Sequence, residues 1–318
     1  MEHDVGRVQA EDWPVYRTSL TTLYQADSLV WLENHVPESF HGVVTDPPYG
    51  MIEYTEEHLA KRKAGHGGVW RIPPSIGGSV RQPLPRFTVL QKEDIQRLRK
   101  FFGEWATKLT RVLVPGAHIL IASTPLVSDV VASGMREAGY EKRGEIVRLV
   151  RTLRGGDRPK GAEKDFLGVN SMPRSCWEPW LLFRKPFEGT LADNLRKWKA
   201  GGLRRLSSRE PFPDVIASSR TPKAEREIAP HPSLKPQAFL RRVVWAMLPL
   251  GEGVLLDPFA GSGSTLAAAE ALGYRCEGTE KYPEYFELAK VAIPRLAELP
   301  VGLQQMLSTA KFIDSAAE

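Results

Sequence analysis

A stiff, polar turn directly after a short apolar run is the feature that most limits how this chain can fold. Residues 43–44 are both valine, which is typical of a buried strand, and they lead through Thr45 into Asp46-Pro47-Pro48-Tyr49. Proline fixes its own φ angle and favours an extended residue before it. We therefore expect the strand to end abruptly, with the Asp46 carboxylate and the Pro47 carbonyl in set positions.

The same turn indicates what it could bind. Two fixed hydrogen-bond acceptors beside the aromatic face of Tyr49 suit a planar ligand that carries an NH2 group, such as the exocyclic amine of a nucleobase. A strand-ending Asp-Pro turn without any chemical role is the alternative interpretation. The turn alone does not decide between them.

Composition narrows the class of protein. The 318 residues predict one large α/β domain with an insertion, or about two domains. A net charge of +5 and a pI near 9.1 favour an anionic partner. With only Cys176 and Cys276, both expected to be core thiols, a disulfide framework and a cysteine-rich zinc site are excluded, and no metal site is predicted. No long apolar run or leader is visible, so we expect a cytoplasmic protein of bacterial, archaeal or phage origin with no membrane partner.

Apolar runs that alternate with helical patterns predict the fold class. Apolar residues at three- and four-residue steps indicate an amphipathic helix from Lys92 that stops at Pro115-Gly116. Further helices are predicted at 29–32, 125–138, 237–248 and 266–272, and strands at 23–25, 42–45, 118–122, 146–150, 180–183, 253–257 and 275–280. This rhythm predicts an α/β fold with a mostly parallel, doubly wound sheet and helices on both faces.

Two stretches interrupt the rhythm. Residues 51–90 are rich in glycine, proline and basic residues, which predicts a long loop. Residues 194–228 carry nine Lys or Arg against four acids, which is an excess of five positive charges. The second stretch fits a phosphate-contacting surface for nucleic acid, and a solvated basic face is the alternative. The residues that we predict to contact nucleic acid are Arg196, Lys197, Lys199, Arg204, Arg205 and Arg209.

A glycine-rich turn follows the strand at 253–257. It begins at Asp257 and leads into a predicted helix N-terminus, where glycines let a ligand approach the backbone N–H groups. Glu280 ends the next strand, where a carboxylate can accept both hydroxyls of a ribose. A dinucleotide fingerprint needs a third glycine where Leu266 stands, and the chain has no Gly-Lys-Ser/Thr for a triphosphate. Adenosine with a short chain, as in S-adenosylmethionine, therefore fits better than NAD or ATP.

Three motifs in one order resemble a known family. DPPY at 46–49, HPSLKP at 231–236 and DPFAGSGST at 257–265 are similar to motifs of the DNA amino-methyltransferases, which modify adenine N6 or cytosine N4. The catalytic motif comes first and the cofactor motif last, as in the circularly permuted β group of that family. The resemblance covers about residues 22–297. It implies an S-adenosylmethionine-dependent methyltransferase fold in three parts: a catalytic half at 1–186, a target-recognition insertion at 187–228 and a cofactor-binding half at 229–318.

The resemblance also implies roles for individual residues. The catalytic positions are Asp46, Pro47, Pro48 and Tyr49, and the cofactor-binding positions are Asp27, His231, Ser233, Lys235, Asp257, Phe259, Gly261, Ser262, Gly263, Thr265 and Glu280. Asp27 matches an acid near the cofactor adenine, although a helix cap explains it equally well. Residues 231–235 match a segment that closes over the cofactor, with Ser233 where the family more often has threonine.

A mechanism follows from these residues. If Asp46 and the Pro47 carbonyl accept both hydrogens of the amine, its lone pair points at the donated methyl group. A carboxylate with an ordinary pKa of about 3.9 is too weak to deprotonate a neutral amine, so we expect Asp46 to orient the amine and stabilise charge. The target base must leave the duplex, and Tyr49 would then stack on it. The chain itself needs no covalent intermediate.

The sequence leaves several alternatives open. In the resembling family, an aspartate at the first motif position leans towards adenine N6, so we expect a sequence-specific adenine methyltransferase that acts on double-stranded DNA. Cytosine N4 and RNA are the enzymatic alternatives, and a non-catalytic nucleic-acid-binding module is the remote one. Whether the chain forms a homodimer or serves beside a restriction nuclease is also left open.

Overall fold

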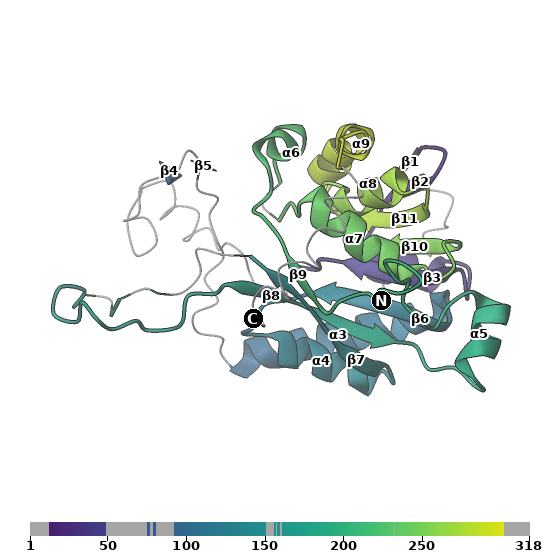
Figure 1. Cartoon of the computed structure of the whole chain (residues 1–318), viewed down its shortest axis with the longest axis horizontal. Helices are drawn as coiled ribbons and strands as arrows, with labels where there is room; N and C mark the ends of the chain where they lie inside the picture. The colour runs from purple at the N-terminus through teal and green to yellow at the C-terminus, as the bar shows by residue number, and fades with distance from the viewer. Residues whose placement is uncertain are drawn as a thin grey trace, which may run out of the picture.

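A nine-stranded sheet with helices on both faces forms the body of the molecule (Figure 1). The computed structural model describes residues 13–48, 92–150, 161–231 and 233–301, together with residues 75–76, 79–80, 156 and 158–159. The strand order is β1 (Val15–Arg17), β2 (Thr21–Gln25), β11 (Arg275–Glu280), β10 (Val254–Asp257), β3 (Phe40–Thr45), β6 (Leu113–Ala122), β8 (Trp177–Arg184), β7 (Glu141–Leu149) and β9 (Val215–Ala217). A separate short pair is formed by β4 (Ser75–Ile76) and β5 (Ser79–Val80).

The central strands all run in the same direction. From β2 through β11, β10 and β3 to β6, each strand is parallel to its neighbour, whereas β8 runs antiparallel between β6 and β7. Parallel strands end at one edge of the sheet, which we call the carboxyl edge, and begin at the other, the amino edge. The loops that follow these strands therefore meet at the carboxyl edge, where ligands bind in open α/β sheets.

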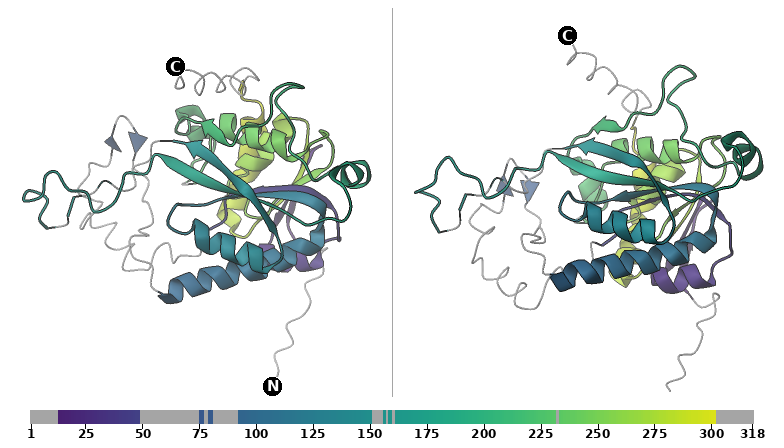
Figure 2. Two further views of the ribbon diagram at one scale, coloured as in Figure 1. Left: turned by 60° about the horizontal axis from the view of Figure 1, so that its bottom comes forward. Right: turned by 90° about the horizontal axis from the view of Figure 1, so that it is seen from below.

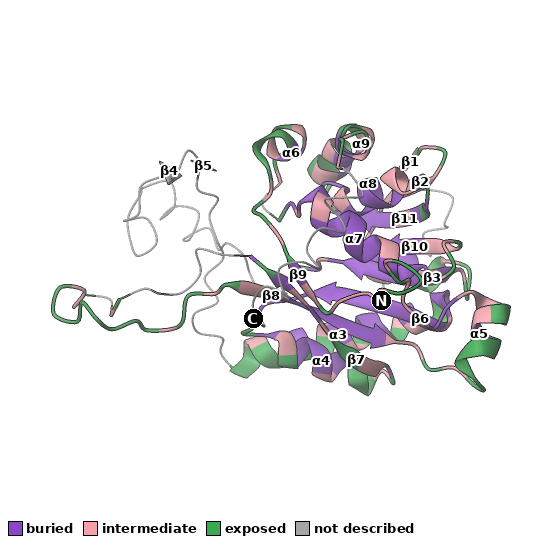
Figure 3. Ribbon diagram, in the orientation of Figure 1, coloured by how far each residue is buried: buried purple, intermediate pink, exposed green. Residues whose placement is uncertain are grey.

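Two groups of helices cover the two faces of the sheet (Figures 1 and 2). One group comprises α1 (Ser28–Asn34), α3 (Lys92–Val112) and α4 (Ser128–Glu137), and the other α7 (Gln237–Met247), α8 (Ser264–Ala271) and α9 (Pro283–Ala297). The strands between them are largely buried (Figure 3). Two further helices among the described residues are α5 (Leu191–Trp198) and α6 (Lys223–Ile228).

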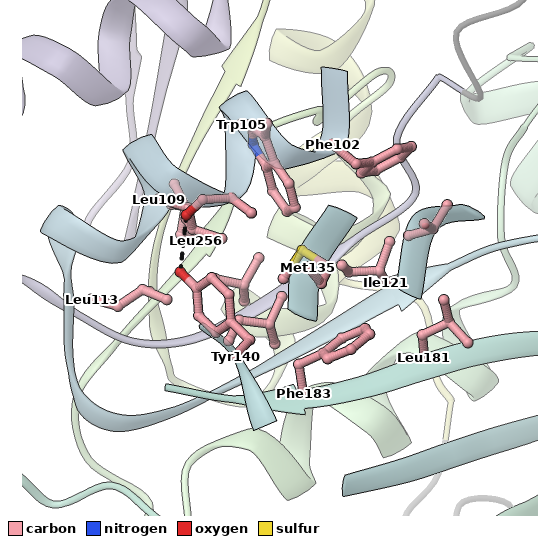
Figure 4. Close-up of a cluster of buried hydrophobic side chains, with 14 of the residues drawn as sticks. Phe102, Trp105, Leu109, Leu113, Ile121, Met135, Tyr140, Leu181, Phe183 and Leu256 are labelled. Atoms are coloured by element: carbon pink, nitrogen blue, oxygen red, sulfur yellow. Dashed lines mark hydrogen bonds between the residues drawn. The ribbon is translucent and has the colours of Figure 1, made fainter. Parts of the chain in front are cut away.

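The core on the α3 face shows why this helix forms. Its apolar residues at three- and four-residue steps, among them Phe102, Trp105 and Leu109, are fully buried against the sheet. Met135 of α4 and Phe183 of β8 complete the same cluster (Figure 4). Burying a side chain of this size stabilises the fold by roughly 2 kcal/mol.

Most elements predicted from the sequence are confirmed, with two corrections. The helix from Lys92 was expected to reach Pro115-Gly116, but it ends at Val112, because Leu113 already pairs with Phe40 of β3. Cys276 is a buried core thiol as expected, whereas Cys176 is exposed, since it lies just before β8 outside the packed layers. Among the described elements, α5, α6, α9, β4, β5 and β9 had not been predicted from the sequence.

The three-part division of the chain stays a prediction, and the strands show where each predicted part lies in the sheet. The N-terminal strands β1 and β2 lie beyond β11, so they extend the cofactor-side half of the sheet and not the catalytic half. Residues 187–228 supply α5, α6 and the edge strand β9, which pairs with β7. Most of the predicted loop at 51–90 lies outside the described residues. None of the helices in the described ranges is both long and apolar enough to cross a membrane.

Candidate active site

The two motif-bearing strand ends lie side by side. Strand β3 is the parallel neighbour of β10, with Gly42 opposite Leu255 and Val43 opposite Leu256. At their carboxyl ends the Thr45 hydroxyl donates a 2.7 Å hydrogen bond to Oδ1 of Asp257. The turn at Asp46 and the glycine turn after Asp257 therefore open at the same edge.

Asp257 acts as the anchor between the two turns. Its carboxylate is 2% exposed and also accepts the backbone N–H of Phe259 at 3.2 Å. Burial disfavours the charged form and raises the pKa of Asp257 to about 6, although its hydrogen bonds act in the opposite direction. Asp257 therefore links the Thr45 side chain at the end of β3 to the backbone of the glycine turn at Phe259.

The glycine turn is shaped by close neighbours. Gly261 and Gly263 have φ angles of 53° and 78°, which glycine adopts without strain. A side chain at Gly261 would lie 3.2 Å from the ring of His231, and one at Gly263 would lie 2.5 Å from Ile293. Ser262 and Thr265 of the same turn are buried. Only glycine fits at these two positions, so the backbone of the turn stays close to the neighbouring segments.

Glu280 lies at the end of β11, beside the glycine turn. Its carboxylate accepts the backbone N–H of Gly261 at 2.9 Å and that of Tyr282 at 2.8 Å. Burial raises the pKa of Glu280, while these hydrogen bonds lower it. Each carboxylate oxygen has more than one lone pair, so Glu280 can still accept hydroxyl donors.

Asp27 extends the row of acids to β2. Its Oδ1 accepts the N–H of Leu29 and caps α1, and its Oδ2 lies 2.9 Å from Nζ of Lys281. Burial alone would raise the pKa of Asp27, but the bonds from Lys281 and Leu29 together outweigh it and lower the pKa. The structure therefore shows the capping role that the sequence offered as the alternative, at a position adjacent to Glu280.

The described residues of the HPSLKP segment, 231 and 233–236, contact both turns. His231 packs against Gly261 and makes an edge contact with Tyr285, with ring centroids 4.5 Å apart. Burial lowers the pKa of His231 to about 4, so the imidazole is neutral at neutral pH. The N–H of Ser233 donates to Nδ1 of His231 at 3.2 Å. This hydrogen bond holds the segment in a tight turn.

Lys235 makes a contact that the sequence did not indicate. Its Nζ lies 2.5 Å from Oδ2 of Asp46, the predicted catalytic carboxylate, and 3.5 Å from Oε1 of Glu178 on β8. Glu178 in turn accepts from Arg148 of β7 at 3.0 Å. Neither Glu178 nor Arg148 was a predicted site residue, because both lie in ordinary strand patterns without a motif.

Phe259 packs into the boundary between the site and the core. Its ring centroid is 5.7 Å from that of Trp105 and 6.2 Å from that of Phe101. The predicted aromatic Tyr49 lies outside the described residues, while Pro47 is buried and Pro48 exposed. Among the described residues, no three His, Cys, Asp or Glu side chains gather in a way that could hold a metal ion.

The predicted DNA-contacting residues lie away from these turns. Asn194 of α5 donates to the carbonyl of Pro115, which lies near the start of β6. Arg204 packs over the ring of Trp245 at the end of α7, and Lys199 approaches Glu252, just before β10. These contacts place the segment at the amino edge. The six residues concerned are Arg196, Lys197, Lys199, Arg204, Arg205 and Arg209.

Comparison with known proteins agrees with this geometry. The family model described as DNA methylase matches residues 40–291. The Type II methyltransferase M2.DpnII of Streptococcus pneumoniae is 35% identical over 278 residues, which is 87% of this chain and 91% of that protein. The residues matched by the family model include every motif discussed above from DPPY to Glu280.

Solved structures share the fold. The putative DNA modification methylase TTHA0409 of Thermus thermophilus, complexed with S-adenosyl-L-methionine, is 22% identical with a TM-score of 0.53, over 87% of this chain and 94% of that one. The cytosine-N4-specific PvuII DNA methyltransferase is 16% identical with a TM-score of 0.55, over 92% of each chain. The predicted S-adenosylmethionine-dependent methyltransferase fold is confirmed. The chain therefore belongs to the DNA methylase family and is a site-specific DNA methyltransferase.

Proposed function

We propose that this chain transfers a methyl group from S-adenosylmethionine to the N6 amine of an adenine turned out of duplex DNA. The observation that carries this proposal is the hydrogen bond from Thr45 to Asp257. It joins the ends of β3 and β10, so that the acceptors of Asp46 and Pro47 lie next to the glycine turn. The S-adenosyl-L-methionine in the TTHA0409 complex, which has the same fold, supports the choice of donor.

The residues at the carboxyl edge fit this donor. The two glycines let a ligand approach the backbone of the turn closely, and Glu280, which accepts the N–H of Gly261, can also accept the two ribose hydroxyls. Phe259, Gly261 and Gly263 would line the methionine portion, and Asp27 would lie near the adenine. When bound, S-adenosylmethionine supplies an electrophilic methyl group on a sulfonium.

Asp46 and Pro47 act on the target amine. The nitrogen is a poor nucleophile because its lone pair is delocalised into the base. The Asp46 carboxylate and the Pro47 carbonyl would accept its two N–H groups, which localises the lone pair and points it along the transfer direction. As the nitrogen gains positive charge, the negative charge of Asp46 stabilises it.

DNA approaches the carboxyl edge in this proposal. The described residues between β7 and β8 form an arm, which we call the β7–β8 arm (156, 158–159 and 161–176), and it projects from this edge (Figures 1 and 2). The arm carries Arg158, Lys164 and Arg174, and it exposes Phe166 and Leu167 by 51% and 65%. Basic residues can contact phosphates while exposed apolar residues contact bases or sugars, so the arm suits a duplex beside Asp46.

Cytosine N4 is the second candidate for the modified position. The likeness to the cytosine-N4-specific PvuII enzyme favours it, whereas the aspartate at the first position of the DPPY motif favours adenine. Both amines offer two hydrogens to the same pair of acceptors, so the described contacts fit both bases. Identification of the methylated nucleoside therefore decides between adenine and cytosine.

Labelled methyl transfer tests the proposal. The protein is incubated with radioactive S-adenosylmethionine and duplex DNA, and the DNA is digested to nucleosides. We expect N6-methyladenine, and we expect Asp46→Ala to lower the rate about 10²- to 10³-fold, as for the loss of one stabilising group. Glu252→Ala, an exposed acid at the amino edge, is the matched control. Label in N4-methylcytosine, in RNA only or in no product would reject the adenine assignment.

The relatives suggest a biological setting. M2.DpnII and M2.LlaDCHI are both named Type II methyltransferases. We propose that this chain likewise protects the DNA of its host from a restriction nuclease. Mapping the modified positions in a host that expresses the chain, followed by digestion with nucleases that cut the mapped sequence, would show whether protection occurs.

A further inference from the structure

Four charged side chains from four segments form a connected row at the carboxyl edge. Asp46 follows β3, Lys235 precedes α7, Glu178 lies on β8 and Arg148 lies on β7. Their side chains are between 6% and 18% exposed. Charges that are this poorly hydrated are stable only when they are paired, so each member depends on its neighbours.

Lys235 lies between two carboxylates but is closer to one of them. Its Nζ is 2.5 Å from Asp46 and 3.5 Å from Oε1 of Glu178. That Oε1 is buried and accepts no hydrogen bond from any described residue. Glu178 thus presents a second carboxylate oxygen at a distance that the ammonium covers by moving about 1 Å.

Glu178 itself is held in place from the far side. Arg148 donates to its Oε2 at 3.0 Å, to the Ser218 hydroxyl at 3.0 Å and to the Ser219 carbonyl at 3.0 Å. The guanidinium also lies 5.1 Å from the ring centroid of Phe239. A carboxylate fixed in this way keeps its position when a cation approaches or leaves.

The other ionisable groups around the row do not replace these charges. Burial lowers the pKa of His231 to about 4, so it is neutral, and the Asp257 carboxylate faces Thr45 and Phe259. Glu225 of α6 accepts the backbone N–H of Gln237 at 2.9 Å. Lys235 is therefore the cation that directly faces Asp46 among the described contacts.

We propose that Lys235 is a positioning residue for methyl transfer, which holds Asp46 as a carboxylate in the free enzyme and moves onto Glu178 when the target amine binds Asp46. This inference rests on the proposed function. It assigns Lys235 to the catalytic carboxylate and not to the cofactor.

Electrostatics explains both halves of the movement. A poorly hydrated carboxylate without a neighbouring cation binds a proton more readily, and a protonated acid no longer offers a full negative charge to the amine. Conversely, an ammonium that stayed on Oδ2 of Asp46 would compete with the amine for that oxygen. Transfer to Glu178 keeps the ammonium paired while it releases the oxygen, and the row keeps two positive and two negative charges throughout.

The pH dependence of methyl transfer tests this role. Single-turnover rates are measured for the wild type, Lys235→Met, Lys235→Arg and Glu178→Gln. The measurements run from about pH 5 to about pH 9, because a nearby charge can move the titration of a carboxylate into this range. The acid limb of the pH–rate profile is the part in which the rate falls as the pH is lowered. For Lys235→Met we expect this limb to move to higher pH by about one unit or more, with the rate recovering at high pH. Lys235→Arg retains the charge, so it should restore the position of the acid limb.

Glu178→Gln tests the second half of the proposal, which is the movement of Lys235 onto Glu178. The acid limb should stay in place because Lys235 still faces Asp46, while the maximal rate falls by about tenfold, since the ammonium loses its second carboxylate. The double variant Lys235→Met/Glu178→Gln removes one charge of each sign, so the four-residue row keeps the net charge that it has in the wild type. Its acid limb should also move up.

Two results would overturn the inference while leaving the proposed function intact. If Lys235→Met and the double variant lose the same fraction of activity at every pH, Lys235 has only a structural role. If calorimetry shows that S-adenosylmethionine binding weakens in parallel with the rate, Lys235 is a cofactor ligand. Failure of the wild type to methylate DNA would instead reject the proposed function itself.

Discussion

The carboxyl and amino edges of the sheet both carry clusters of basic residues, but the two clusters are built differently. At the carboxyl edge, Lys235 and Arg148 are largely buried and each is paired with a carboxylate. At the amino edge, Arg205 is exposed and donates to the carbonyls of Ser207 and Arg209 in its own loop. Buried pairs fix the geometry of a site, whereas exposed arginines on a loop mainly order that loop. The number of charges in a segment therefore says less about whether the segment belongs to the active site than the edge of the sheet at which the segment lies.

The same contrast extends to single buried ionisable groups. His118 lies on β6 opposite Gly42, towards the amino edge, and Asp257 lies at the carboxyl end of β10. Burial is the largest influence on both, and it disfavours the charged form of each. Because one is a base and the other an acid, the two edges are expected to lose stability in opposite directions of pH.

Among the variants that test this comparison, His118→Gln is expected to change the pH dependence of the unfolding free energy most. Burial, with Arg184 and Arg143 nearby, lowers the pKa of His118 to about 3 from a usual value of 6.5. Below about pH 6.5 the unfolded chain binds a proton there that the native protein does not, so His118 destabilises the fold as the pH falls. Between about pH 7 and about pH 4 the wild type should lose about 3–4 kcal/mol of unfolding free energy that the variant retains.

Urea unfolding at a series of pH values measures this difference. The unfolding free energies of the wild type and His118→Gln are compared at each pH, because other groups also titrate and cancel in the difference. His41→Gln is a useful control, since burial also lowers its pKa but the group is only partly buried. A constant difference across the range would mean that His118 binds its proton as readily in the native protein as in the unfolded chain.

Asp257→Asn should show the opposite trend with a smaller size. The folded pKa of about 6 lies above the usual value of 3.8, so the native protein holds the proton more tightly than the unfolded chain does. Stability from this group is complete below about pH 4 and is lost as the pH rises through about pH 6, by about 2–3 kcal/mol. Asparagine does not titrate, so the variant should gain on the wild type over this range.

The prediction is checked by the change of stability with pH and not by the absolute stability of the variant. Asparagine changes the hydrogen bonds with Thr45 and Phe259 by an amount that does not depend on pH. Unfolding midpoints at about pH 4 and about pH 7 therefore give the result by their difference. A variant that gains nothing between these values would show that Asp257 is already ionised at the lower pH.

Sequence patterns predicted the fold because its signals are local. Val43, Val44 and the run at 253–257 are apolar and end in Asp-Pro turns, which specifies both strands and the ends where they stop. Parallel pairing then places both ends at one edge. The helix stop was misjudged at Pro115-Gly116, because the pairing of Leu113 with Phe40 is a long-range contact that no local pattern contains.

The site was predictable only where a motif marks it. Asp46, Gly261 and Glu280 stand in recognisable positions, but Glu178 and Arg148 occupy plain strand positions. Their importance comes from the antiparallel pairing of β7 with β8, which sets them opposite each other next to Lys235. The basic segment was assigned to DNA from its charge and from the family resemblance, and the edge at which it lies depends on contacts such as that of Asn194 with the Pro115 carbonyl.

Two matched pairs of exposed basic residues test which edge binds DNA. Arg158 and Lys164 lie on the β7–β8 arm at the carboxyl edge, and Arg205 and Arg209 lie at the amino edge. Each pair is changed to glutamine, and affinity for duplex DNA is measured at several salt concentrations. A lost phosphate contact reduces the slope of log K against log salt by about 0.9, so the arm variant should lose up to about 1.8.

The amino-edge variant is expected to bind with nearly unchanged affinity and slope, because its residues face away from the edge that holds Asp46. Circular dichroism and the thermal midpoint of each variant show that the loop at 205–209 and the arm remain folded. If the arm variant keeps the wild-type slope while Arg205→Gln/Arg209→Gln loses it, the original assignment from the sequence is correct. DNA would then have to reach from the amino edge to the turn at Asp46.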